Sequence, residues 1–216
     1  PQFAQELANM NVSSGDRVGR LVEGVQIIRR LWSEERVTHQ GTFYSFTDLE
    51  VLPKPVQRSV PILIAANPKP QGLDDRVVDR ILRRVATYGD GWQTDATPVE
   101  TFRERFDRIR EYAEAQGRDA KNFDSCLHLM VNINDDHQQA LAEAQHFLQS
   151  YYGAGTVSQE KADLWLACGS PEAVAEKIEA YIDAGCTMPV LRFVSPDLKG
   201  QLRRCIEEVM PGFSSD

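Results

Sequence analysis

Four short apolar runs, each followed by a helical pattern, constrain the fold of this chain more than any other feature. The runs cover residues 61–66, 92–94, 124–134 and 189–194. The first is apolar at every position, as in a strand that is covered on both faces of a sheet. Repeated strand–helix units predict a parallel sheet with right-handed crossovers. The pattern therefore indicates an α/β fold.

The helices predicted after these strands have apolar residues at steps of three and four. They cover residues 75–88, 97–113, 136–151, 170–184 and 198–210. We expect Gly89 to end the first of them in a left-handed conformation. Thr97 and Glu100 have the spacing of a capping box, with Pro98 in the first turn.

Upstream of the first strand, the sequence has a different character. Residues 17–32 predict one amphipathic helix. Residues 37–46 are rich in aromatic and β-branched side chains around a glycine, which predicts a hairpin or an extended excursion. No linker or repeat divides the chain, so we expect a single domain over residues 1–216.

Composition limits the partners of the chain. Its 216 residues include 32 acidic and 24 basic side chains, a formal charge of −8. This balance disfavours nucleic acid and anionic membranes, which attract clustered positive charge. No apolar run approaches the ~20 residues of a membrane span, and the first residues do not resemble a signal peptide. The four cysteines contain no C-x-x-C pair, which favours reduced thiols in a cytoplasmic protein.

Ligands of parallel α/β folds bind where the strands end. All four predicted strands change there from apolar to small or polar residues. The residues in question are Ala66-Asn67, Thr94-Asp95, Asn132 to Asn134 and Val194-Ser195. Two interpretations stay open, a shared polar site or ordinary helix caps.

The loop after the first strand is a candidate phosphate site. It leads into the amino end of a helix, where free backbone N–H groups favour anions. Gly72 would allow a close approach, and Lys69, Arg76 or Arg80 could add positive charge. The opposing interpretation is that Asp74 and Asp75 complement the helix dipole without any ligand.

Three further polar residues are candidates for chemistry. His128 and Asn132 share one face of the third strand, where a structural histidine is the simpler interpretation. Arg192 must meet a carboxylate, a ligand anion or solvent. Residues 134–137 carry Asp and His, but they fit a helix cap better than a metal site. We therefore predict no metal site.

Seven segments in order resemble the bacterial-luciferase-like, flavin- or F420-dependent monooxygenases. They read IRRLW, GTFY, PKPVQ, PILIA, RVATYGDGW, GSPEAVAEKI and DAGC, between residues 28 and 186. The resemblance implies a (β/α)8 TIM barrel that binds FMN, as reduced flavin, or F420 at the carboxyl ends of its strands. It also implies oxidation of a small organic substrate and, for some members, a separate flavin reductase.

The resemblance implies site residues as well. The cofactor phosphate would lie at the segment from Ala66 and Asn67 to Gly72. The cofactor would also lie near Trp92, Gln93 and Thr94.

The sequence departs from the family pattern in one respect that bears on enzymatic function. Only the later four strand–helix units are recognisable, and 216 residues are short for a barrel of ~250. The residues closest to the reacting carbon belong to earlier strands in the family, so no catalytic residue is assigned. The alternative is a truncated, non-catalytic flavin-binding protein that covers its open sheet edges by forming a homodimer.

Overall fold

A computed structural model describes residues 4–68, 74–153 and 166–213 of the chain. By its internal contacts the chain divides into two compact units, the first ending at Ile62 and the second beginning at Leu63. None of the described helices is both long and apolar enough to cross a membrane.

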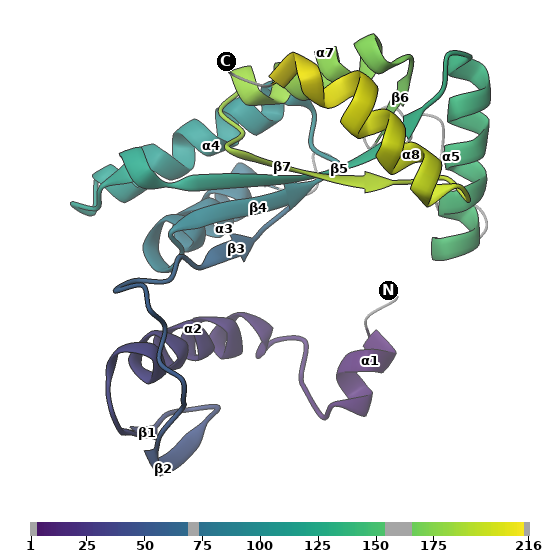
Figure 1. Cartoon of the computed structure of the whole chain (residues 1–216). Coiled ribbons are helices and arrows are strands. Elements are labelled where there is room, and N and C mark those ends of the chain that lie inside the picture. The colour runs from purple at the N-terminus through teal and green to yellow at the C-terminus, as the bar shows by residue number, and fades with distance from the viewer. Residues whose placement is uncertain (1–3, 69–73, 154–165, 214–216) are drawn as a thin grey trace. The chain divides into compact units, whose positions relative to one another are not determined.

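The first unit joins two helices to a hairpin. The helices are α1 (Ala4–Asn9) and α2 (Arg17–Ser33), and the antiparallel strands are β1 (Val37–Gln40) and β2 (Ser45–Leu49). The helix and the hairpin predicted for this segment are therefore both confirmed. Figure 1 shows α2 and the hairpin in purple and blue.

Glu23 of α2 fastens the helix to the hairpin. Its carboxylate accepts hydrogen bonds from the backbone N–H groups of Phe43 and Tyr44 at 3.1 and 3.0 Å, and from His39 Nε2 at 3.0 Å. Burial tends to raise the pKa of Glu23, but these hydrogen bonds outweigh it and leave the pKa below its ordinary value. The carboxylate thus stays charged where the hairpin needs an acceptor.

The second unit contains a parallel sheet, which confirms the α/β fold. Its strands are β3 (Leu63–Ala65), β4 (Gly91–Asp95), β5 (Asp124–Ile133), β6 (Leu166–Gly169) and β7 (Met188–Phe193). All pairings are parallel, and β5 is the central strand (Figure 1). β7 pairs with one edge of β5. On the other edge, β4 pairs with residues 124–128 of β5 and β6 pairs with residues 130–133. Strand β6 was not predicted.

The helices follow the predicted order with small differences. They are α3 (Asp75–Tyr88), α4 (Val99–Glu114), α5 (His137–Tyr152), α7 (Pro171–Asp183) and α8 (Leu198–Arg204). The last one was predicted to run to Met210. It ends as an α-helix at Arg204 and continues as a π turn and a 3-10 turn.

Two predicted helix ends are wrong in detail. Gly89 ends α3 at φ −91°, a conformation open to any residue, and its N–H simply bonds to Val85 O. The capping box of α4 does not form, because the Thr97 hydroxyl bonds to Thr94 Oγ1 at 2.9 Å and to Asp95 O at 2.8 Å. Both ends are set by contacts with residues two to four positions earlier in the chain.

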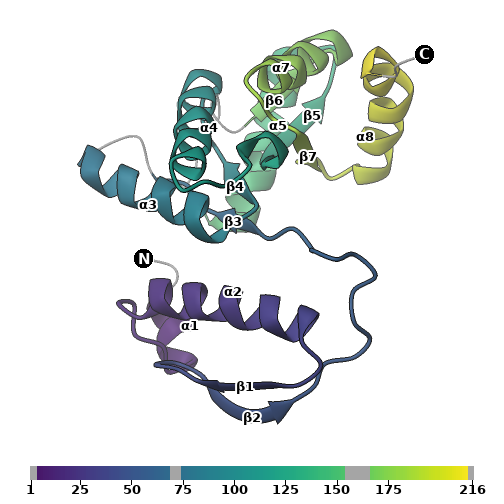
Figure 2. The same ribbon diagram turned by 90° about the vertical axis from the view of Figure 1, so that its left-hand side faces the viewer.

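The two faces of the sheet have different surroundings. One face packs under α3, α4 and α7, with Trp92, Leu127, Leu129 and Val131 buried in that core. Figure 2 shows α3 and α4 side by side in this helical layer. On the other face, α5 covers only the end of β5, where Leu141, Ala144 and Leu148 contact Met130 and Leu166.

The rest of that second face is the open face. Strand register assigns to it the residues Ala65, Gln93, Asp95, His128, Met188, Val190 and Arg192. Most of them are exposed, including Val190 at 36%.

Gln201 of α8 fixes the carboxyl end of β5. Its buried side chain donates to Ile133 O at 2.9 Å and accepts from Ile133 N–H at 2.7 Å. Arg204 adds a hydrogen bond to the same carbonyl and one to Asp135 Oδ1. These contacts place the last helix against the strand end.

We expect Gly91→Ala to destabilise the protein by about 1–3 kcal/mol, because a Cβ at this position would lie 2.5 Å from Asp124 O of the paired strand. Gly212→Ala is the matched control, since no heavy atom lies within 4 Å of its added Cβ. Urea unfolding followed by circular dichroism measures both. Equal free energies of unfolding for the two variants would contradict the close approach of β4 and β5.

We expect Gln201→Leu to cost about 2–3 kcal/mol, because it leaves the buried N–H of Ile133 without an acceptor. Gln116→Leu removes one exposed hydrogen bond to Tyr112 O and should change the free energy of unfolding by less than about 0.5 kcal/mol. Thermal and urea unfolding compare the pair. A Gln201→Leu variant as stable as the original chain would mean that α8 is held without the hydrogen bonds of Gln201.

Candidate functional site at the carboxyl ends of the strands

Two neighbouring strand ends share a polar contact. The Asn67 side-chain amide, just after β3, donates to Asp95 Oδ1 at 2.6 Å and to Asp95 O at 2.7 Å at the end of β4. Both residues are exposed. The Asp95 carboxylate therefore presents negative charge at this corner, and the Asn67 amide is already engaged.

The polar residues at the other two strand ends act locally. Asn134 Oδ1 accepts from Asp136 N–H, and Ser195 Oγ accepts from Asp197 N–H. Asp136 in turn accepts from the first N–H groups of α5, which confirms the helix cap predicted there. For these two ends the structure favours the helix-cap interpretation.

Trp92 and Thr94 lie on the covered face of the sheet. Trp92 is fully buried, and its indole N–H donates to Ala66 O at 2.7 Å. The Ala66 N–H bonds to Gln93 O, so both backbone groups of Ala66 are engaged. Thr94 contacts Thr97, whose carbonyl accepts from Tyr181 OH at 2.8 Å. Trp92 and Thr94 therefore stabilise the strand ends from the covered face of the sheet.

Gln93 and His128 lie together on the open face. The Gln93 amide nitrogen is 3.0 Å from His128 Nε2. Because an amide nitrogen can only donate, Nε2 accepts, which places the ring proton on Nδ1. His128 is exposed, and beside it burial raises the pKa of the Cys126 thiol above its ordinary value. The imidazole is thus the group on this face suited to holding or moving a proton.

Asn132 takes part in a buried contact with α5. It is fully buried, and its amide donates to Glu143 Oε2 at 2.8 Å and to Val194 O at 3.0 Å. Its Oδ1 has no hydrogen-bond partner in the part of the chain that the structure describes. Cys168 lies close by, and burial raises its pKa to about 12, so this thiol stays protonated.

The amino end of α3 is capped from within. Asp74 Oδ1 accepts from Arg76 N–H at 2.9 Å, as a helix cap does. Lys69 and Gly72 lie outside the described residues, so the phosphate site at this loop stays a prediction. Among the described residues no three His, Cys, Asp or Glu side chains are grouped as metal ligands would be.

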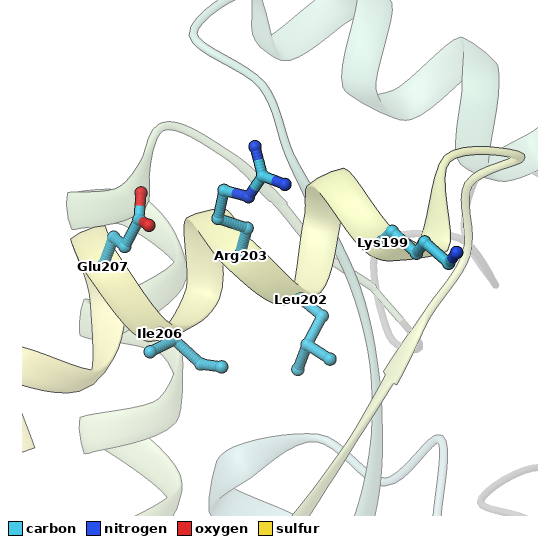
Figure 3. Close-up of a pocket in the computed structure, with 5 residues that line it drawn as sticks. All are labelled: Lys199, Leu202, Arg203, Ile206 and Glu207. Atoms are coloured by element: carbon cyan, nitrogen blue, oxygen red, sulfur yellow. The ribbon is translucent and has the colours of Figure 1, made fainter.

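A groove elsewhere lies along the outer side of α8 and the turn after it. Lys199, Leu202, Arg203, Ile206 and Glu207 line it (Figure 3). None of these residues belongs to the open face. The groove is therefore separate from the candidate site.

Only some residues of this site were predicted from the sequence. Asn67 and Gln93 lie at the exposed strand ends as predicted, while Trp92 and Thr94 point to the helices. Asp95 and His128 contribute to the face, although neither was selected as a cofactor-binding residue. Alternation along β4 was the available signal, because buried Trp92 and Thr94 require Gln93 and Asp95 to face the other way.

Comparison with known proteins gives the family. Residues 2–188 match the family described as luciferase-like monooxygenase. An F420-dependent glucose-6-phosphate dehydrogenase of Kineococcus radiotolerans is 27% identical over 215 residues, covering 91% of this chain and 60% of that protein. Its counterpart in Segniliparus rotundus is 30% identical over 189 residues, covering 79% of this chain and 53% of that protein. The chain thus spans little more than half of these relatives.

Solved structures agree on the fold. An F420-dependent secondary alcohol dehydrogenase in complex with an F420–acetone adduct superposes with a TM-score of 0.76 at 19% identity, over 94% of this chain and 64% of that one. A monooxygenase of Streptomyces bottropensis gives a TM-score of 0.77 at 21% identity, over 98% and 66%. With the match over residues 2–188, this chain belongs to the luciferase-like monooxygenase family.

Proposed function

We propose that this chain is part of an oxidoreductase that uses F420 or FMN and acts on a small organic substrate. The observation that carries the proposal is the exposed Gln93–His128 pair on the open face, beside the joined ends of β3 and β4. Parallel α/β folds bind ligands at this edge of the sheet. The F420-dependent relatives supply the cofactor class.

The residues of the open face fit the ring system of such a cofactor. Flavin and deazaflavin rings are flat and carry N–H and C=O groups at their edges. Ala65 gives a small exposed surface, and Gln93 and His128 add an amide and an imidazole. When bound, the cofactor supplies the redox chemistry, by accepting or donating hydride or, with O2, by oxygenation.

The chain's own residues then have distinct tasks. Gln93 orients the His128 ring through the contact at Nε2. His128 can take up or release the proton that accompanies oxidation of a hydroxyl group. The segment that runs from Ala66 and Asn67 to Gly72 stays the proposed phosphate site, and its later residues would have to bind the phosphate, because Ala66 and the Asn67 amide are already engaged. Trp92 and Thr94 would act indirectly, by fixing the backbone beneath it.

We favour F420-linked dehydrogenation over oxygenation. The curated relatives named above are F420-dependent dehydrogenases, and their identity to this chain is higher than that of the monooxygenase structure. Oxygenation with reduced FMN is the second candidate, favoured by the family to which the chain belongs.

We also infer that the sheet is the later part of a (β/α)8 barrel. In the described chain β3, β6 and β7 each pair with only one other strand, and the relatives are longer by roughly two fifths of their own length. Further strands in those relatives would cover these edges and the open face. Exposed Met188 and Val190 on that face support this inference, because large apolar side chains are usually buried.

Titration with F420, FMN and reduced FMN, followed by fluorescence, tests cofactor binding. We expect Gln93→Ala and His128→Ala to weaken binding at least fivefold, because both side chains lie on the face that the ring would cover. Gln116→Ala, at the exposed end of α4, is the matched control and should bind as the original chain does. Absence of binding by all three cofactors would refute the proposal.

Sedimentation equilibrium tests a third candidate function, a flavin-binding homodimer without turnover. Its support is the edges of the sheet at β3, β6 and β7, each of which pairs with only one other strand in the described chain and could be covered by a second copy. This alternative predicts a dimer that binds cofactor yet shows no substrate-linked turnover. A monomer at micromolar concentration would eliminate this candidate and leave the F420-linked enzyme unaffected.

A further inference from the structure

Three side chains form a cluster on the open face, at the edge of α5. Arg192 of β7 donates through Nη1 to the Tyr152 hydroxyl at 3.1 Å. The guanidinium carbon lies 4.4 Å from the centre of the Tyr151 ring and 6.0 Å from that of Tyr152. The two rings meet edge to face at 4.7 Å. The guanidinium is therefore held by cation–π contacts with the two tyrosine rings and by one hydrogen bond.

The position of this cluster connects it with the candidate site. Arg192 pairs with Met130, and Val190, one step before it on the same face, pairs with His128. Arg192 and His128 are therefore diagonal neighbours on adjacent strands. Arg192 lies nearer to the carboxyl end, where a ligand would enter.

The contacts of Arg192 differ from those of three other half-buried arginines in the second unit. Arg108, Arg118 and Arg204 each form at least one ion pair with an aspartate. In the part of the chain that the structure describes, Arg192 meets phenol rings and a hydroxyl group but no carboxylate. A positive charge that is only partly solvated and has no counter-ion attracts an anion.

Two acids on this side of the sheet are already engaged. Glu143 of α5 accepts from the Asn132 amide. Asp95 accepts from Asn67, on the far side of β5 from Arg192. Neither forms an ion pair with Arg192, so the guanidinium keeps its charge available on the open face.

We propose that Arg192 binds the oxyanion group of the substrate, a carboxylate, sulfonate or phosphate. The inference rests on the proposed function and deepens it, because it names the substrate class. A guanidinium binds such a group through two parallel N–H bonds, and its contact with Tyr152 leaves further N–H groups for this purpose. Tyr151 and Tyr152 are positioning residues that fix the plane of the guanidinium.

An anion at Arg192 also orients the rest of the substrate. The carbon skeleton would extend along the face toward His128, the diagonal neighbour. A hydroxyl on the adjacent carbons would then come within reach of the imidazole, and the cofactor would occupy the side of β3 and β4. The proposed phosphate site is the loop that follows β3, toward the opposite edge of the sheet, so we assign Arg192 to the substrate.

Calorimetric titration at low ionic strength tests the proposal, with benzoate and inorganic phosphate as probes. We expect Arg192→Gln to weaken binding of these probes at least tenfold. Arg192→Lys should retain part of the affinity, because lysine keeps the positive charge but cannot donate two parallel N–H bonds to one anion. Tyr152→Phe should weaken binding about threefold. Arg203→Gln, which removes the same charge on α8, is the matched control and should leave affinity unchanged.

Three results would overturn the proposal. The first is equal probe affinity of Arg192→Gln and the original chain, with circular dichroism showing that both are folded. The second is an original chain that binds neither probe. The third is an Arg192→Gln variant that loses affinity for FMN but not for riboflavin, which lacks the phosphate, because Arg192 would then serve the cofactor. Failure of cofactor binding with intact probe binding would refute only the proposed function.

Discussion

The second unit depends on parallel pairing along β5. This strand has ten residues and pairs with β4, β6 and β7, so its strict alternation assigns a face to nearly every residue of the sheet. Leu127, Leu129 and Val131 lie under the helices, and His128 consequently lies on the open face. A shift of one residue would bury the imidazole and expose the core.

Much of this arrangement could be predicted because it depends on local pattern. The helix α3 and the strands β4 and β5 lie within one or two residues of the predicted ranges. Features that depend on distant contacts could not be predicted. The strand β6 is a four-residue run that exists by pairing with the end of β5. A local competition was also missed, because the Thr97 hydroxyl bonds to Thr94, three residues earlier, and so does not form the predicted cap.

In the candidate site, too, some features could be predicted from the sequence and others could not. A resemblance to a family identifies segments, and it pointed to residues 92–94 as a block. Side chains alternate along β4, so Trp92 and Thr94 face the helices and, of these three residues, only Gln93 lies on the open face. Similarly, Asn67 was expected to be free for a phosphate, but its amide is engaged by Asp95, a contact between the ends of two different strands.

The charges on the open face favour an oriented ligand. Asp95, near β3, gives one end a carboxylate, and Arg192 on β7 gives the other end a guanidinium, with His128 on the strand between them. An anionic substrate would be repelled at the first end and attracted at the second. Its reactive carbon would therefore come to His128 in one direction only. In the proposed complex, fixed opposite charges on the sheet would thus set the direction of binding before any covalent step begins.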